Sequence, residues 1–191
     1  MLNPRRFAGA AVGALLVTAA AATVAFPDWA DWTVSDLVRA TPEIHLVRID
    51  AADTLMERLP AVAHPVPVRR VAARVVESYR GELRLGNPIV FYVPGGTAPD
   101  GSHVMFSTSP AIEDHVGGLS LVFLASGGPL APAGALGLPD GSHGIYRVDA
   151  TRAGPRVVRG KTGSPFPRDA SLDAFAAEAA AALASDERRP R

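Results

Sequence analysis

The side chains best suited to chemistry in this chain belong to a short sequence, Pro-Asp-Gly-Ser-His, that occurs twice. The first copy supplies Asp100 and His103, and the second supplies Asp140 and His143. Carboxylate and imidazole groups are ligands for zinc and similar ions, so these side chains could form a metal site if the two copies lay together. Such a site would support a metal-assisted hydrolase.

The same repeated sequence also has a structural interpretation. Proline fixes φ and glycine accepts positive φ, so Pro-Asp-Gly is typical of a tight turn, and each copy precedes a predicted strand. We favour turns, and we retain Asp100, His103, Asp140 and His143 as the candidate metal ligands.

The remaining histidines form no recognisable catalytic motif. A Glu-Asp-His run at 113–115 could perform acid–base chemistry, but it lies beside a Gly-Gly pair and is typical of a solvated loop. His45 and His64 have no partner nearby in the sequence. Neither a Gly-x-Ser-x-Gly elbow nor a His-Glu-x-x-His motif is present. The sequence therefore predicts no catalytic residue and no cofactor.

The net charge of the chain argues against a nucleic-acid partner. The 191 residues include 19 Lys+Arg and 19 Asp+Glu, so no net charge attracts the chain to nucleic acid. A locally basic stretch contains Arg69, Arg70, Arg74, Arg80 and Arg84. Glutamates interrupt it, and no aromatic series accompanies it for stacking on bases. We interpret the stretch as a solvated face and expect no nucleic-acid partner.

The N-terminal segment predicts export. Arg5 and Arg6 precede an uncharged apolar run over 7–24, and small residues follow where a signal peptidase cleaves, so residues 1–25 are typical of a signal peptide. We therefore expect a periplasmic, cell-envelope or secreted protein. The alternative is an uncleaved anchor over 7–26, and only in that case is a membrane contact predicted. The absence of cysteine removes disulfides and thiol chemistry from the exported protein.

The rest of the chain predicts many short elements. Thr33 is placed to cap a helix through Arg39, and Ser171 to cap one through Ser185, followed by a frayed tail. Between them, strands are expected over 44–50, 89–93, 104–108, 119–125, 145–149 and 156–159. Loops are expected over 60–67 and 127–139, with a turn at Gly154-Pro155.

The segment Val68 to Tyr79 is ambiguous. Its apolar residues fall at helical spacing, and Gly81 would be a suitable helix C-cap. Its valine content and the preceding prolines favour a strand instead. We predict a strand.

Four segments, in this order, resemble a group of uncharacterised exported bacterial β-barrel proteins. They are Arg74 to Gly81, Ile89 to Gly96, Val116 to Leu124 and Gly144 to Val148. In that group one strand ends in a basic residue and glycine, the next ends in Pro-Gly-Gly, and a later one reads Leu-Val-Phe-Leu. The resemblance, over roughly 44–160, implies an OB-like Greek-key barrel. More distantly, the layout is similar to the netrin-like module of tissue inhibitors of metalloproteinases, whose cysteines this chain lacks.

These observations predict a mainly β, α+β protein. We expect a small OB-like Greek-key barrel or curled antiparallel sheet over 26–170, with a short N-terminal helix, and a C-terminal helix and tail over 171–191 that pack on it. The leading functional hypothesis is a non-enzymatic binding or accessory domain of the cell envelope, with an unidentified envelope or extracellular partner or ligand. The metal-assisted hydrolase is the alternative.

Overall fold

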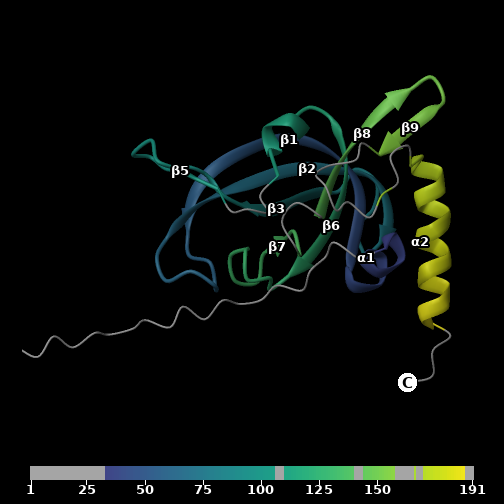
Figure 1. Cartoon of the computed structure of the whole chain (residues 1–191), viewed down its shortest axis with the longest axis horizontal. Coiled ribbons are helices and arrows are strands. Elements are labelled where there is room, and N and C mark those ends of the chain that lie inside the picture. Colours follow the sequence, from purple (N-terminus) through teal and green to yellow (C-terminus); the bar gives the residue numbers. More distant parts are fainter. Residues whose placement is uncertain (1–32, 106–109, 140–143, 158–165, 167–169, 188–191) are drawn as a thin grey trace, which may run out of the picture.

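The structure is a computed structural model that describes residues 33–105, 110–139, 144–157, 166 and 170–187. It is mainly β, with a helix near each end of the described chain (Figure 1). In chain order the elements are α1 (Val34–Ala40), β1 (Glu43–Glu57), β2 (Val66–Arg80), β3 (Pro88–Pro94), β4 (Gly96–Thr97), β5 (His103–Val104), the 3-10 helix η2 (Ile112–His115), β6 (Leu119–Ser126), β7 (Leu136–Gly137), β8 (Ile145–Thr151), β9 (Gly154–Val157) and α2 (Leu172–Glu187).

The main sheet has seven strands in the order β1-β2-β3-β7-β6-β8-β9. β1 also pairs with β6, so β1, β2, β3, β7 and β6 form a hydrogen-bonded circuit that curls around an interior. The pairing of β3 with β7 is parallel, at Tyr92 and Gly137, and the other pairings are antiparallel. The barrel-like, mainly β fold expected from the sequence is confirmed.

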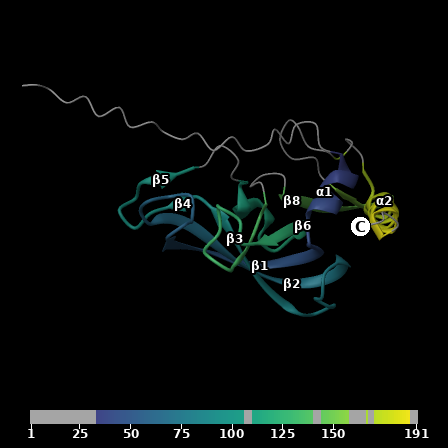
Figure 2. The same ribbon diagram turned by 90° about the horizontal axis from the view of Figure 1, so that it is seen from below.

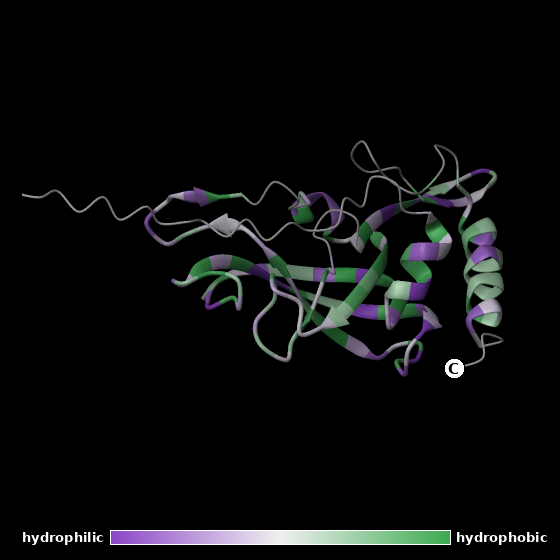
Figure 3. Cartoon of the chain, turned by 60° about the horizontal axis from the view of Figure 1, so that its bottom comes forward, coloured by the Kyte–Doolittle hydropathy of each residue, from purple (hydrophilic) through white to green (hydrophobic). Residues whose placement is uncertain are grey.

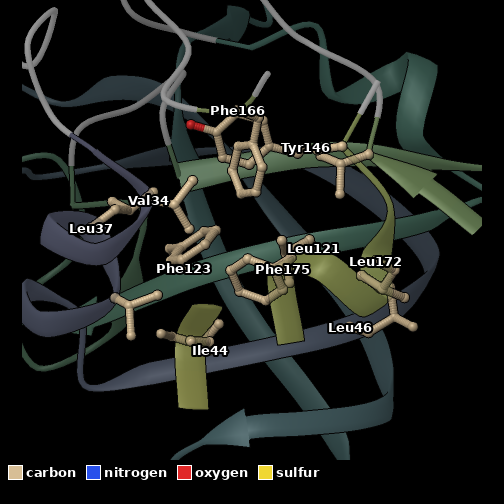
Figure 4. Close-up of a cluster of buried hydrophobic side chains, with 14 of the residues drawn as sticks. Val34, Leu37, Ile44, Leu46, Leu121, Phe123, Tyr146, Phe166, Leu172 and Phe175 are labelled. Carbon is tan, nitrogen blue, oxygen red and sulfur yellow. The ribbon is translucent and has the colours of Figure 1, made fainter. Parts of the chain in front are cut away.

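Both faces of β6 and of the Ile44–Val47 part of β1 are buried, since successive side chains, which point to opposite faces of a strand, are buried there alike. Ile44 and Phe123 belong to a core between these strands and the helices, which we call the helix-side core (Figure 4). Val47 and Val122 belong to a second cluster within the strand circuit, which we call the inner core. This double burial explains the continuous apolar run of β6.

The two helices begin as the sequence predicts. The Thr33 hydroxyl accepts a hydrogen bond from the Asp36 amide, and the Asp36 carboxylate accepts one from the Thr33 amide, which completes a capping box. The Ser171 hydroxyl accepts a hydrogen bond from the Ala174 amide at the start of α2. α2 and α1 lie together at one end of the molecule, and β4 and β5 lie at the other (Figures 1 and 2).

The segment Val68 to Tyr79 is confirmed as a strand, within β2. Val71, Ala73 and Val75 are buried in the inner core, whereas Arg70 and Arg74 between and beside them are exposed. The period is two residues, as in a half-buried strand. The helical spacing in the sequence arises because three residues outside the buried set, Ala72, Val76 and Tyr79, are also apolar, although Val76 is exposed and the other two are only partly buried.

Several predicted boundaries are wrong. β1 continues to Glu57 and β2 begins at Val66, because the two strands pair over their full lengths, well past the part of β1 that pairs with β6 (Figure 3). β7 lies inside the loop predicted over 127–139. The turn between β8 and β9 is at 152–153, and Pro155 lies in an edge strand, where a missing amide is tolerated.

Other predictions fall outside the described residues. The signal segment over 1–25 is among them, as are parts of the predicted strands over 104–108 and 156–159 and the end of the tail. No helix within the described ranges is long and apolar enough to cross a membrane.

Candidate functional site

The first Pro-Asp-Gly-Ser-His copy forms a turn. One carboxylate oxygen of Asp100 accepts hydrogen bonds from the Ser102 amide at 2.9 Å and the Ser102 hydroxyl at 2.6 Å. These bonds hold the pKa of Asp100 below its usual value. Gly101 has a φ of +84°, which a glycine adopts without strain. The structural interpretation of this copy is therefore confirmed.

His103 forms a hydrogen bond close to this turn. Its Nδ1 lies 3.1 Å from the Thr97 hydroxyl, across the β4–β5 pair. Asp140 and His143 lie outside the described residues, so the metal site built from Asp100, His103, Asp140 and His143 stays a prediction. Over the described part of the chain, no group of three or more His, Asp or Glu side chains could hold a metal ion.

The expectation that His45 has no partner nearby in the sequence is wrong: its ring has two partners, and one of them, Glu43, lies two residues before it. Its ring is completely buried, with Nε2 2.9 Å from the Glu43 carboxylate and Nδ1 3.1 Å from the Ser78 hydroxyl. Ser78 lies opposite His45 on β2, after a register shift that follows Val75. Serine, histidine and glutamate linked in series are the side chains of an acyl-transfer triad.

Burial argues for a structural role of this network. A general base must reach both the nucleophile and the leaving group of a substrate, and the His45 ring has no exposed surface. Buried polar groups must instead be paired, and Glu43 and Ser78 satisfy both ring nitrogens. The network therefore ties β1 to β2 at the end of the barrel that faces α1.

His115 forms a second histidine–serine pair. Its Nδ1 lies 2.9 Å from the hydroxyl of Ser120, which is fully buried on β6. The run 113–115, expected to be a solvated loop, is a short helix, and Glu113 pairs with Arg69. Burial, and then the charge of Arg147, lower the pKa of His115, while Asp114 opposes them.

This shift predicts a pH dependence of stability. Near pH 6.5 the unfolded chain takes up a proton at His115 that the folded chain accepts only at lower pH, so unfolding becomes easier as the pH falls from about 7 to 5. His115→Gln should remove part of that loss. Urea unfolding at several pH values measures it, with the exposed His64→Gln as the matched control. Identical pH profiles for both variants would contradict the prediction.

The basic stretch separates into buried and exposed arginines. The Arg69 side chain is buried and pairs through Nε with the Glu113 carboxylate at 2.8 Å. Arg80 donates to the carbonyls of Val38, Arg39 and Thr41, which end α1. The interpretation of the whole stretch as a solvated face is therefore wrong for Arg69 and Arg80.

Three exposed arginines, Arg48 on β1 and Arg70 and Arg74 on β2, lie on the outer face of the sheet formed by β1, β2 and β3, whereas Arg84 lies in the loop between β2 and β3. On this face Arg48 of β1 is paired with Arg74 of β2, and Asp53 of β1 with Arg70 of β2. Between these two pairs lies an apolar row across the three strands, Ala51, Ala72 and Val90. We call this surface the arginine face. The arginine side chains of this face are 46–60% exposed, and Val90 is 45% exposed. The helices α1 and α2 pack instead against the helix-side core, which contains no residue of β3.

Asp50 organises one end of the arginine face. A register shift between Ile49 and Ala51 makes Asp50 an extra residue in β1. One of its carboxylate oxygens lies 3.7 Å from Nε of Arg48, and the other accepts a hydrogen bond from Nε of Arg74 at 3.2 Å. We call these three residues the arginine clamp. Within the described ranges, the Nη groups of Arg48 and Arg74 donate no hydrogen bond.

Comparison with protein-family models, with curated proteins and with solved structures gives no match. The resemblance to exported bacterial barrel proteins and the netrin-like module therefore stays a prediction.

Proposed function

We propose that the chain is an exported, non-enzymatic binding or accessory domain of the bacterial cell envelope, and that it contacts its partner through the arginine face. The observation that carries the proposal is a broad, folded surface with exposed guanidinium groups and a central apolar strip, Ala51–Ala72–Val90. Interfaces are enriched in arginine, which combines charge with planar hydrogen-bonding geometry.

The described candidates for chemistry support binding over catalysis. The Asp100 carboxylate is bonded to Ser102 within its own turn, and His45 is enclosed by Glu43 and Ser78. These side chains have structural tasks. The arginine face is not needed to complete either core, so its exposed side chains are available to a partner.

The absence of cysteine gives a direct test of this surface. Val90→Cys creates a unique thiol on the arginine face, and Ala180→Cys creates one on the exposed side of α2. Each variant is labelled with a thiol-directed photo-crosslinker and illuminated in envelope extract. We expect a discrete product from the Val90→Cys protein that excess unlabelled wild-type protein competes away. No competed product, or equal products from both thiols, would contradict the proposal.

Metal analysis distinguishes the proposal from the metal-assisted hydrolase. We expect the purified protein to hold no stoichiometric zinc or manganese. If the protein holds a stoichiometric metal and the His103→Ala, His143→Ala double variant loses it, the result would contradict the proposed binding domain and support the metal-assisted hydrolase. Mass measurement of the protein recovered from the envelope tests export, because cleavage after residue 25 removes the N-terminal segment.

A further inference from the structure

We propose that the arginine face binds an extended acidic polypeptide, in which two carboxylates four positions apart flank an apolar residue. This inference rests on the proposed binding function and names the chemistry of its partner. It begins from the arginine clamp, where Arg48 and Arg74 are direct neighbours on adjacent strands. Like charges in that position repel each other, and a single carboxylate, Asp50, lies between them.

The clamp leaves its best hydrogen-bonding edges open. Asp50 approaches both guanidinium groups at Nε, so it orients them while leaving their Nη groups without a hydrogen-bond partner in the described structure. The Nη edge of arginine donates parallel hydrogen bonds to a carboxylate. An incoming carboxylate would therefore gain charge-assisted bonds and relieve the repulsion between the arginines.

A third cation, Arg70, lies further along β2. Arg70 and Arg74 share a face of β2 with Ala72 between them, so their backbones are about 13 Å apart at roughly 3.3 Å per residue. An extended peptide has the same repeat, and its residues i, i+2 and i+4 point to one side. Acidic, apolar and acidic residues at those positions match Arg74, Ala72 and Arg70. The exposed pair of Arg70 with Asp53, at 3.3 Å, is weak enough to exchange.

Other occupants match the face less well. A polysaccharide is usually held by stacking on aromatic rings, and Tyr92, half-buried at the margin, is the aromatic residue of this face. A second copy would place arginines opposite arginines. A lipid surface would require large exposed apolar side chains, whereas the central strip consists of Ala51, Ala72 and Val90.

Fluorescence anisotropy with purified protein tests the inference. The probe is a labelled nine-residue peptide with glutamate at its third and seventh positions, valine at its fifth, and serine and threonine elsewhere. We expect saturable binding that weakens with added salt. Arg48→Gln and Arg74→Gln should each weaken it about tenfold, whereas Arg152→Gln, at an exposed turn, should change it less than about twofold.

Charge exchange keeps the test independent of folding defects. Arg74→Glu should reject the glutamate peptide and bind a peptide with lysine at one of the two acidic positions more tightly than wild-type protein does. No binding by wild-type protein, equal loss in Arg152→Gln, tighter binding of polygalacturonate or anionic vesicles, or self-association through this face would overturn the inference. If these peptides fail while Val90→Cys still crosslinks specifically, the proposed binding function stands and its acidic ligand is wrong.

Discussion

Replacing Phe123 by alanine should lower the free energy of unfolding by about 3–5 kcal/mol, the usual cost of removing a buried phenylalanine ring. Phe123 is completely buried on β6, and its ring centroid lies 6.0 Å from that of Tyr146 and 5.9 Å from that of Phe175 on α2. Both pairs meet edge to face, which adds stability beyond the buried area (Figure 4). The cavity left by the missing ring would therefore weaken the packing of α2 on the sheet as well as the sheet itself.

Urea unfolding followed by circular dichroism measures this loss. The matched control is Leu85→Ala, because the Leu85 side chain is 76% exposed and its deletion should change stability by less than about 0.5 kcal/mol. Hydrogen exchange should also speed up in α2 of the Phe123 variant, if α2 is held by this core. A loss below about 1 kcal/mol would show that the helix-side core does not stabilise the fold.

Much of the fold follows from local sequence. Thr33 and Ser171 were identified as caps because their hydroxyls precede apolar segments at the spacing that capping requires. β6 was identified because strands with two buried faces have continuous apolar residues. The ends of β1 and β2 could not be predicted in the same way. Each strand continues as a ribbon because the other pairs with it, and pairing between distant segments leaves no local signal.

The His45 network and the arginine clamp were also hard to predict, because both depend on pairing between distant segments of the chain. Glu43 lies one residue before the strand predicted over 44–50, and only in β1, which begins at Glu43, do Glu43 and His45 share a face two residues apart. The third member, Ser78, lies opposite only because β2 shifts register after Val75. The arginine clamp likewise depends on the register shift at Asp50 and on the pairing of Arg48 with Arg74. Composition showed a basic stretch, but only the register distinguishes the exposed arginines from Arg69 and Arg80.

The turn after β2 should be as sensitive to substitution as the core, because Gly81 joins the backbone to the His45 network. Gly81 has a φ of +106°, a conformation that costs other residues about 1–2 kcal/mol. A Cβ atom at this position would also overlap the Glu43 carboxylate that holds Nε2 of His45. Gly81→Ala should therefore strain the turn, displace Glu43 and leave a buried ring nitrogen unpaired, at a total cost of about 2–4 kcal/mol.

A double-mutant cycle separates the backbone strain at Gly81 from the overlap between the added Cβ atom and the Glu43 carboxylate. In a Glu43→Ala background the overlap is absent, so Gly81→Ala should cost only the backbone strain, about 1–2 kcal/mol. The difference between the two backgrounds then measures how strongly the turn and the buried histidine are coupled. Equal costs in both would mean that Glu43 moves away freely, and that the hydrogen bond between Glu43 and His45 does not hold the barrel end in place.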